Sequence, residues 1–64
     1  MKHRKGGIAN ELIQNIRRYN TDSQVTIVKD KAVEVIQWGF DCKRYEFADG
    51  TRLIHNEMAN GWDV

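Results

Sequence analysis

The stretch CKRYEFADGTRLIHN, from Cys42 to Asn56, consists of two runs of alternating side chains joined by an Asp-Gly turn. This pattern is typical of a β-hairpin. Its turn suits a loop of three residues, Ala48 to Gly50, because glycine adopts the left-handed conformation of the last loop position without a steric penalty. We therefore predict a hairpin here and arrange the remaining segments around it.

The length of this loop decides which residues face each other across the hairpin. With three loop residues, the pairs on one surface are Lys43 with His55, Tyr45 with Leu53 and Phe47 with Thr51, and those on the other are Arg44 with Ile54 and Glu46 with Arg52. A two-residue loop would separate the aromatic–aliphatic pair and the opposite-charge pair, each of which contributes about 0.2–1 kcal/mol. The three-residue loop is therefore favoured, and it turns Tyr45, Phe47 and Leu53 inward.

Residues 8–19 have the spacing of an amphipathic helix. Apolar side chains recur there at intervals of three and four residues, at Ile8, Ala9, Leu12, Ile13, Ile16 and Tyr19. Arg17 and Arg18 fall in the last turn, where cations meet the negative end of the helix dipole. The polar run from Asn20 to Ser23 is predicted to end the helix. Because a helix this short is marginal in isolation, it needs a sheet to pack against.

Further strands are predicted on both sides of the hairpin. Residues 24–29, QVTIVK, alternate β-branched and polar side chains, which indicates a strand. Residues 32–38, AVEVIQW, favour a strand because Val, Ile and Trp are enriched in strands and Gly39 next to them is a common bulge or bend residue. Their phase requires either a bulge or two covered faces, and their spacing also fits a helix. Asn60-Gly61 is a strong turn signal, and Trp62 and Val64 alternate behind it like a short last strand.

These elements predict an α+β fold in which one N-terminal amphipathic helix packs on one face of a four- to five-stranded antiparallel meander. Residues 7–64 are expected to form a single domain, preceded by a flexible basic arm, residues 1–6. The 64 residues include one cysteine, so no internal disulfide restrains the unfolded chain. That lone cysteine, with no signal peptide and no long apolar run, favours the cytoplasm and predicts no membrane contact.

The sequence contains no motif for catalysis or metal binding. A glycine-rich phosphate loop, a nucleophile elbow and paired-cysteine spacing are all absent. Cys42 and His55 are the one pairing of a nucleophile with a base, and the predicted register points them to opposite faces. His3 and His55 do not define a coordination geometry. We therefore predict that the protein is not an enzyme and binds neither a cofactor nor a metal ion.

The sheet face that the helix leaves open is the predicted partner-binding surface, with a merely solvated face as the alternative. It carries Arg44, Glu46, Arg52 and Ile54, a mixture that includes the arginines enriched at protein interfaces. The net charge of +1 gives no general attraction to nucleic acid. We predict a small non-catalytic module that regulates or inhibits a larger partner, a protein or a ribonucleoprotein. Unpaired strand edges offer a second route, to a homodimer.

Nucleic-acid binding is the alternative function. Its phosphate contacts would come from Lys2, Arg4, Lys5, Arg17 and Arg18, and Tyr45 or Phe47 would stack on bases. At the level of fold alone, one helix on an antiparallel sheet in so short a chain resembles phage-encoded inhibitors of bacterial defence systems. That resemblance implies an inhibitor of bacterial machinery of the type carried by phages and mobile elements.

Overall fold

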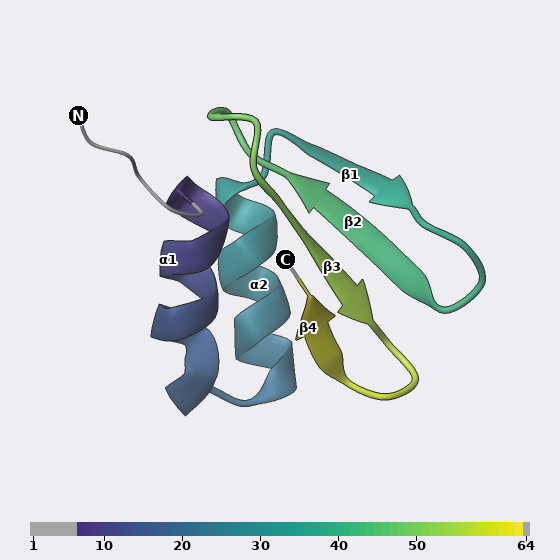
Figure 1. Ribbon diagram of the computed structural model, residues 1–64. Coiled ribbons are helices and arrows are strands. Elements are labelled where there is room, and N and C mark those ends of the chain that lie inside the picture. Colours follow the sequence, from purple (N-terminus) through teal and green to yellow (C-terminus); the bar gives the residue numbers. More distant parts are fainter. Residues whose placement is uncertain (1–6, 64) are drawn as a thin grey trace.

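The computed structural model describes residues 7–63, which form two helical segments and one antiparallel sheet (Figure 1). In chain order the elements are α1 (Gly7–Asn15), continued by the 3-10 helix η1 (Ile16–Arg18), α2 (Thr21–Lys31), β1 (Glu34–Gln37), β2 (Cys42–Glu46), β3 (Arg52–Asn56) and β4 (Gly61–Asp63). Each strand pairs with the next one along the chain, in the order β1-β2-β3-β4. Both helices lie on the same side of the sheet (Figure 1). The predicted α+β class and antiparallel meander are therefore confirmed, and the predicted basic arm, residues 1–6, lies outside the described residues.

Residues 24–29 are part of α2, so the prediction of a strand there is wrong. The Asn20 side chain accepts a hydrogen bond from the Ser23 backbone N–H at 2.9 Å and so caps the start of α2. Lys29 and Lys31 lie in its last turn, where they complement the helix dipole. The polar run after the first helix is thus also the start of a second one. This cap and the burial of Val28 outweigh the low helix propensity of the β-branched side chains.

The hairpin of β2 and β3 has the predicted register. Tyr45 pairs with Leu53, and the Phe47 N–H donates to the Thr51 carbonyl at 3.0 Å. Gly50 has φ +89°, as the last position of the predicted loop requires. The three side chains predicted to face inward, Tyr45, Phe47 and Leu53, are all buried. The sheet therefore presents one covered face to the helices and one open face.

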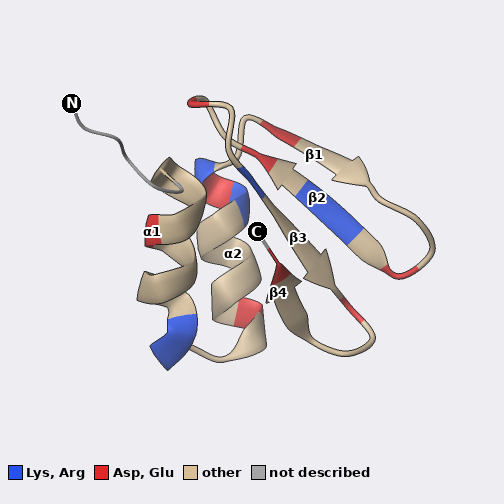
Figure 2. Ribbon diagram, viewed as in Figure 1, with Lys and Arg blue, Asp and Glu red and all other residues tan. Residues whose placement is uncertain are grey.

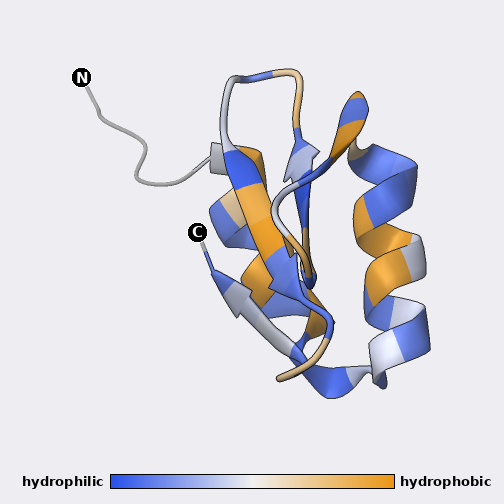
Figure 3. Ribbon diagram, turned by 90° about the vertical axis from the view of Figure 1, so that its right-hand side faces the viewer, coloured by the Kyte–Doolittle hydropathy of each residue, from blue (hydrophilic) through white to orange (hydrophobic). Residues whose placement is uncertain are grey.

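Strands β1 and β4 form the two edges of the sheet. β1 confirms the strand interpretation of residues 32–38 and begins with a bulge, because the Val33 N–H donates to the Glu46 carbonyl at 2.8 Å while Glu34 also pairs with Glu46. The predicted last strand is confirmed as β4, which pairs with β3. In Figure 3 the middle of β3, where Leu53 and Ile54 lie, is hydrophobic (orange) between hydrophilic ends (blue). Leu53 faces the helices and its neighbour Ile54 faces the open side, so β3 has an apolar side chain on each face of the sheet.

The core lies between the two helices and the covered face of the sheet. Its buried apolar side chains are Ala9, Leu12, Ile16, Val28, Tyr45, Phe47 and Leu53. Full burial of a large apolar side chain stabilises a fold by about 1.5–3 kcal/mol, so this cluster is the main source of stability. Within residues 7–63, neither helix is long and apolar enough to cross a membrane.

The hairpin turn is joined to the start of α1 by side-chain hydrogen bonds. The Asp49 carboxylate accepts from the Ile8 N–H at 2.9 Å, and the Thr51 hydroxyl oxygen accepts from the Ala9 N–H at 3.1 Å. These are backbone donors of the first helical turn, which has no intrahelical acceptor for them. The turn therefore fixes where the helix lies on the sheet.

Gln24 makes the corresponding connection at the other end of the helices. Its Nε2 donates to the carbonyls of Ile16 and Tyr19, both at 2.9 Å, and its Oε1 accepts from the Trp62 indole N–H at 3.0 Å. One side chain of α2 thereby joins the end of the first helix to β4.

Candidate partner-binding surface

The open face of the sheet carries the four residues predicted to bind a partner. Arg44 and Glu46 lie on β2, next to Ile54 and Arg52 on β3. Because neighbouring residues of a strand point to opposite faces, all four lie on the side away from the helices. Ile36 of β1 pairs with Arg44 and belongs to the same face. The register therefore brings the predicted residues together, and whether they bind a partner stays a prediction.

Arg44 is held in place at the centre of this face. Its Nη2 atom lies 2.7 Å from Glu46 Oε2, and its guanidinium carbon lies 4.3 Å from the centroid of the Trp38 ring. A cation over an aromatic ring contributes about 0.5–1 kcal/mol at an exposed site. Glu46 faces Arg52 across the hairpin as predicted, yet its ion pair is with Arg44 of its own strand. We call Trp38, Arg44 and Glu46 the arginine stack.

Exposed apolar side chains adjoin this face at one end of the sheet. The β1–β2 and β3–β4 turns lie side by side there (Figure 1), because the Glu57 N–H donates to the Asp41 carbonyl at 2.8 Å. Lys43 Nζ, 3.4 Å from Glu57 Oε2, adds an ion pair between them. Phe40 is 92% exposed and Met58 75% exposed on these turns. Sequence reasoning missed both residues, and the available signal was an apolar side chain inside each turn.

Cys42 and His55 point to opposite faces, as the predicted register requires. Cys42 pairs with Asn56, while His55 is 3% exposed on the covered face. Its ring stacks on Trp62 with centroids 4.2 Å apart, and its Nε2 lies 3.4 Å from the Asn60 amide oxygen. His55 is therefore out of hydrogen-bond reach of the thiol, which is the contact that a cysteine nucleophile needs. Among residues 7–63, no group of three His, Cys, Asp or Glu side chains is arranged to hold a metal ion.

Two ionisable side chains of the described residues have clearly shifted pKa values, and both lie away from the open face. Burial raises the pKa of Tyr45, with a smaller lowering by Lys43 and a raising by Glu57. The pKa of Asp49 is lowered, first by the hydrogen bond from the Thr51 hydroxyl and then by that from the Ile8 N–H. Both shifts belong to groups with structural roles, one in the core and one at the helix start.

The residues of the nucleic-acid hypothesis do not form one surface in the described chain. Lys2, Arg4 and Lys5 lie outside the described residues. Figure 2 shows the remaining basic residues (blue) divided among the end of the first helix, the end of α2 and the sheet, with acidic residues (red) between them. Tyr45 and Phe47 are buried, so neither is available to stack on a base. The part of the hypothesis that remains is the exposed pair Arg17 and Arg18 in η1.

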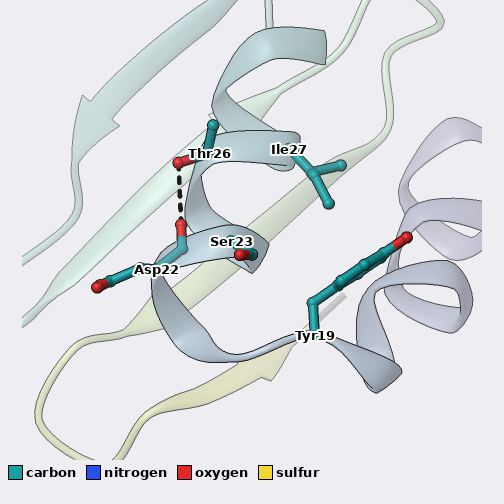
Figure 4. A pocket seen from close by; sticks show the side chains of 5 residues that line it. All are labelled: Tyr19, Asp22, Ser23, Thr26 and Ile27. Carbon is teal, nitrogen blue, oxygen red and sulfur yellow. Dashed lines mark hydrogen bonds between the residues drawn. The ribbon is translucent and has the colours of Figure 1, made fainter.

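A hollow of about 370 Å³ lies between the end of the first helix and α2 (Figure 4). Its lining consists of Tyr19, Asp22, Ser23, Thr26 and Ile27. The Thr26 hydroxyl donates to the Asp22 carbonyl at 2.9 Å, a bond internal to α2. Small-molecule sites combine a mostly apolar lining with a few polar groups that converge on the ligand. In Figure 4 the Asp22 carboxylate points away from the Tyr19 ring, and the Thr26 hydroxyl is bonded within α2, so the polar groups do not converge and the open face is the stronger candidate site.

The chain was compared with models of protein families, with curated proteins and with solved structures. None of these comparisons found a match.

Proposed function

We propose that this protein is a small non-catalytic binding module that regulates or inhibits a larger protein through its open sheet face. The observation that supports it is the arginine stack, in which a guanidinium on an exposed face is held between the Trp38 ring and the Glu46 carboxylate. Tryptophan and arginine are the side chains enriched at interface hot spots. An arginine that is ordered beforehand loses less side-chain entropy on binding, so more of its contact energy contributes to affinity.

The surroundings of the arginine stack also suit an interface. Arg44 has half-buried isoleucines on both sides, Ile36 on β1 and Ile54 on β3. Arg52 is exposed beside them, and Phe40 and Met58 adjoin one end. Protein interfaces typically have an apolar centre inside a polar rim. A partner with a shallow apolar surface and a carboxylate for Arg52 would fit this arrangement.

The more specific form of the proposal is an inhibitor of bacterial machinery of the phage or mobile-element type, acting in the cytoplasm. Its support is the fold class, a short chain with helices on one face of an antiparallel sheet. The lone thiol of Cys42 fits a reducing compartment. Bacterial lysate is therefore the first source in which to look for the partner.

The test is capture of a partner by the immobilised chain, with identification by mass spectrometry and reconstitution from purified components. We expect a stoichiometric complex that Arg52→Glu abolishes, because that substitution reverses a charge on the open face. Arg17→Glu is the matched control, since it makes the same charge change at an exposed position on the first helix. Circular dichroism confirms that both variants fold. Recovery of no partner, or equal loss with both variants, would contradict the proposal.

Nucleic-acid binding is the second candidate, and the observation that favours it is the exposed pair Arg17 and Arg18 next to the half-exposed ring of Tyr19. The same two variants separate the two candidate functions, because Arg17→Glu would abolish nucleic-acid binding and Arg52→Glu would preserve it. Its affinity would also fall steeply with salt, and alanine at Lys2, Arg4 and Lys5 would reduce that slope.

A further inference from the structure

The edge strand β1 and the turn after it form an apolar strip. Six large hydrophobic side chains are exposed in the described chain, and four of them lie between residues 33 and 40. Val33, just before β1, is 66% exposed, Val35 is 41% exposed on the helix side of β1, and Trp38 and Phe40 follow at its end. A strand edge with apolar side chains and unpaired backbone groups is a template for another strand. This strip is therefore where an additional strand would bury the most apolar surface.

The hydrogen bonds of β1 show which of its backbone groups point to the free edge. The Trp38 N–H donates to the Cys42 carbonyl at 2.8 Å, so alternation directs the backbone groups of Ile36 to β2 and those of Val35 and Gln37 outward. Val33 does not add to the outward set, because its N–H donates to the Glu46 carbonyl in the bulge. The edge thus offers the N–H and C=O groups of two residues, Val35 and Gln37.

We propose that a second copy of this chain pairs antiparallel with β1, which joins the two sheets into one. Val35 of each copy exchanges hydrogen bonds with Gln37 of the other, and the two Ile36 residues face each other on the two-fold axis. This register uses both outward residues of each strand. A register centred on Val35 would instead oppose Gln37 to Val33, whose N–H is already bonded within its own sheet. The free backbone groups therefore select the first register.

The side chains in this register favour a second copy over an unrelated strand. Within its own sheet Glu34 lies directly opposite Glu46, and like charges in that position are destabilising. In the dimer Glu34 lies opposite Trp38 of the second copy, whose ring carries the Arg44 guanidinium at 4.3 Å. Each copy thus places a cation beside the other's unfavourable carboxylate pair, as a self-complementary two-fold interface requires.

The apolar strip is also covered by the same strip of the second copy. Val33 of one copy comes to lie beside the turn that carries Phe40 of the other, and the two Ile36 side chains meet on the open face. The two-fold axis runs perpendicular to the sheet, so both pairs of helices stay on one side and both open faces lie on the other. The dimer is independent of the proposed function.

The first test is the concentration dependence of the molar mass, measured by sedimentation equilibrium. Paired short strands make an interface below about 1,200 Å², so the range to cover is about 10 μM to 1 mM. We expect the mass to rise toward that of two chains. Val35→Lys weakens association about tenfold or more, because a charge at the sheet edge opposes pairing. Met58→Lys is the matched control, since it adds the same charge to an exposed apolar position away from β1, and it leaves association unchanged. A single-chain mass throughout, or an equal response of the two variants, overturns the proposal.

The second test fixes the register by disulfide trapping in a Cys42→Ala background, which removes the native thiol. Residues facing each other at a non-hydrogen-bonded antiparallel position are about 4.5 Å apart between Cα atoms, which suits a disulfide. Ile36→Cys therefore forms a covalent dimer under mild oxidation, and Val35→Cys forms much less. In the unmodified chain, exchange of the Val35 and Gln37 amide protons slows as concentration rises. No trapping with either cysteine, preferential trapping at position 35, or exchange that is independent of concentration overturns the proposal.

Discussion

Asp49 joins the hairpin turn between β2 and β3 to the start of α1. Its carboxylate accepts hydrogen bonds from the Thr51 hydroxyl at 2.6 Å, the Thr51 N–H at 3.0 Å and the Ile8 N–H at 2.9 Å. Gly7 precedes Ile8 with φ +53°, and a Cβ atom at Gly7 would collide with the Asp49 carboxylate. Only glycine is tolerated where the chain enters α1 in this way. One turn residue thus determines both the start of the helix and its place on the sheet.

The lowered pKa of Asp49 predicts a specific acid sensitivity. The folded chain keeps this carboxylate charged at a pH where the unfolded chain, with its ordinary pKa of 3.8, has begun to bind a proton. The stabilising effect is therefore complete above 3.8 and is lost as the pH falls through the lowered folded value. We expect Asp49→Asn to be less stable than the natural chain at neutral pH and to lose less stability on acidification. Urea denaturation between about pH 6 and pH 2 measures this. Asp30→Asn, at an exposed position on α2, is the control, and identical pH profiles for both variants would contradict the prediction.

Gln24 has a comparable role at the opposite end. Replacing it by leucine leaves the Tyr19 carbonyl and the Trp62 indole N–H without their present partners, whereas the Ile16 carbonyl still accepts from the Tyr19 N–H. We expect Gln24→Leu to lower the free energy of unfolding by about 1–3 kcal/mol, mainly the cost of leaving the partly buried Trp62 indole N–H unsatisfied. Urea denaturation followed by tryptophan fluorescence measures the loss. Gln14→Leu, on the exposed side of α1, should change the free energy of unfolding by less than about 0.5 kcal/mol. A loss equal to that of Gln24→Leu would contradict the prediction.

The two helices differ as elements in how firmly they are anchored. The first helical segment buries Ala9, Leu12 and Ile16, whereas α2 buries only Val28. Segments with few buried apolar contacts open more readily than the core. We therefore expect the amide protons in the middle of α2 to exchange faster than those around Leu12, in hydrogen exchange followed by NMR. Equal protection of the two helices would show that half-buried contacts such as Ile27 anchor α2 as firmly.

Elements that local signals determine are the ones that the sequence predicts correctly. Gly50 and the alternating pattern around it are local signals, so they were sufficient for the hairpin, its register and the residues of the open face. The segment 24–29 carries β-branched side chains that favour a strand, and what makes it helical is the Asn20 cap together with packing of Val28 against distant residues. Long-range packing of this kind has no counterpart in a short sequence window.

Exposure of individual apolar side chains is similarly hard to predict. Phe40 and Met58 both lie in turns, and a turn residue of either type has the same appearance in the sequence whether it is buried under a neighbouring element or left in water. Only the relative placement of the two turns shows that these side chains stay exposed. The arginine stack was missed for a related reason, since it depends on the pairing of β1 with β2, which places Trp38 diagonally beside Arg44.

At the scale of the whole molecule, the open face and the β1 edge are separate surfaces on one sheet. The face is centred on Arg44 and its isoleucine neighbours, whereas the edge consists of the outward backbone groups of Val35 and Gln37. A two-fold through the edge leaves Arg44, Arg52 and Ile54 of both faces uncovered and places the two faces side by side, with the Ile36 side chains at their junction. A dimer would therefore offer a partner two copies of the same surface, which raises the effective concentration of the second once the first is bound.

This separation predicts that single substitutions divide the two proposed interactions. Arg52→Glu should abolish partner capture and leave self-association unchanged, because Arg52 lies on β3, two strands away from the β1 edge. Val35→Lys should weaken self-association about tenfold or more and still capture the partner, with lower retention on a densely coated surface because fewer chains then offer a second binding site. Capture assays and sedimentation equilibrium on both variants provide the four measurements. If either substitution alone abolished both interactions, the face and the edge would be one surface and the geometric division argued from the register would be wrong.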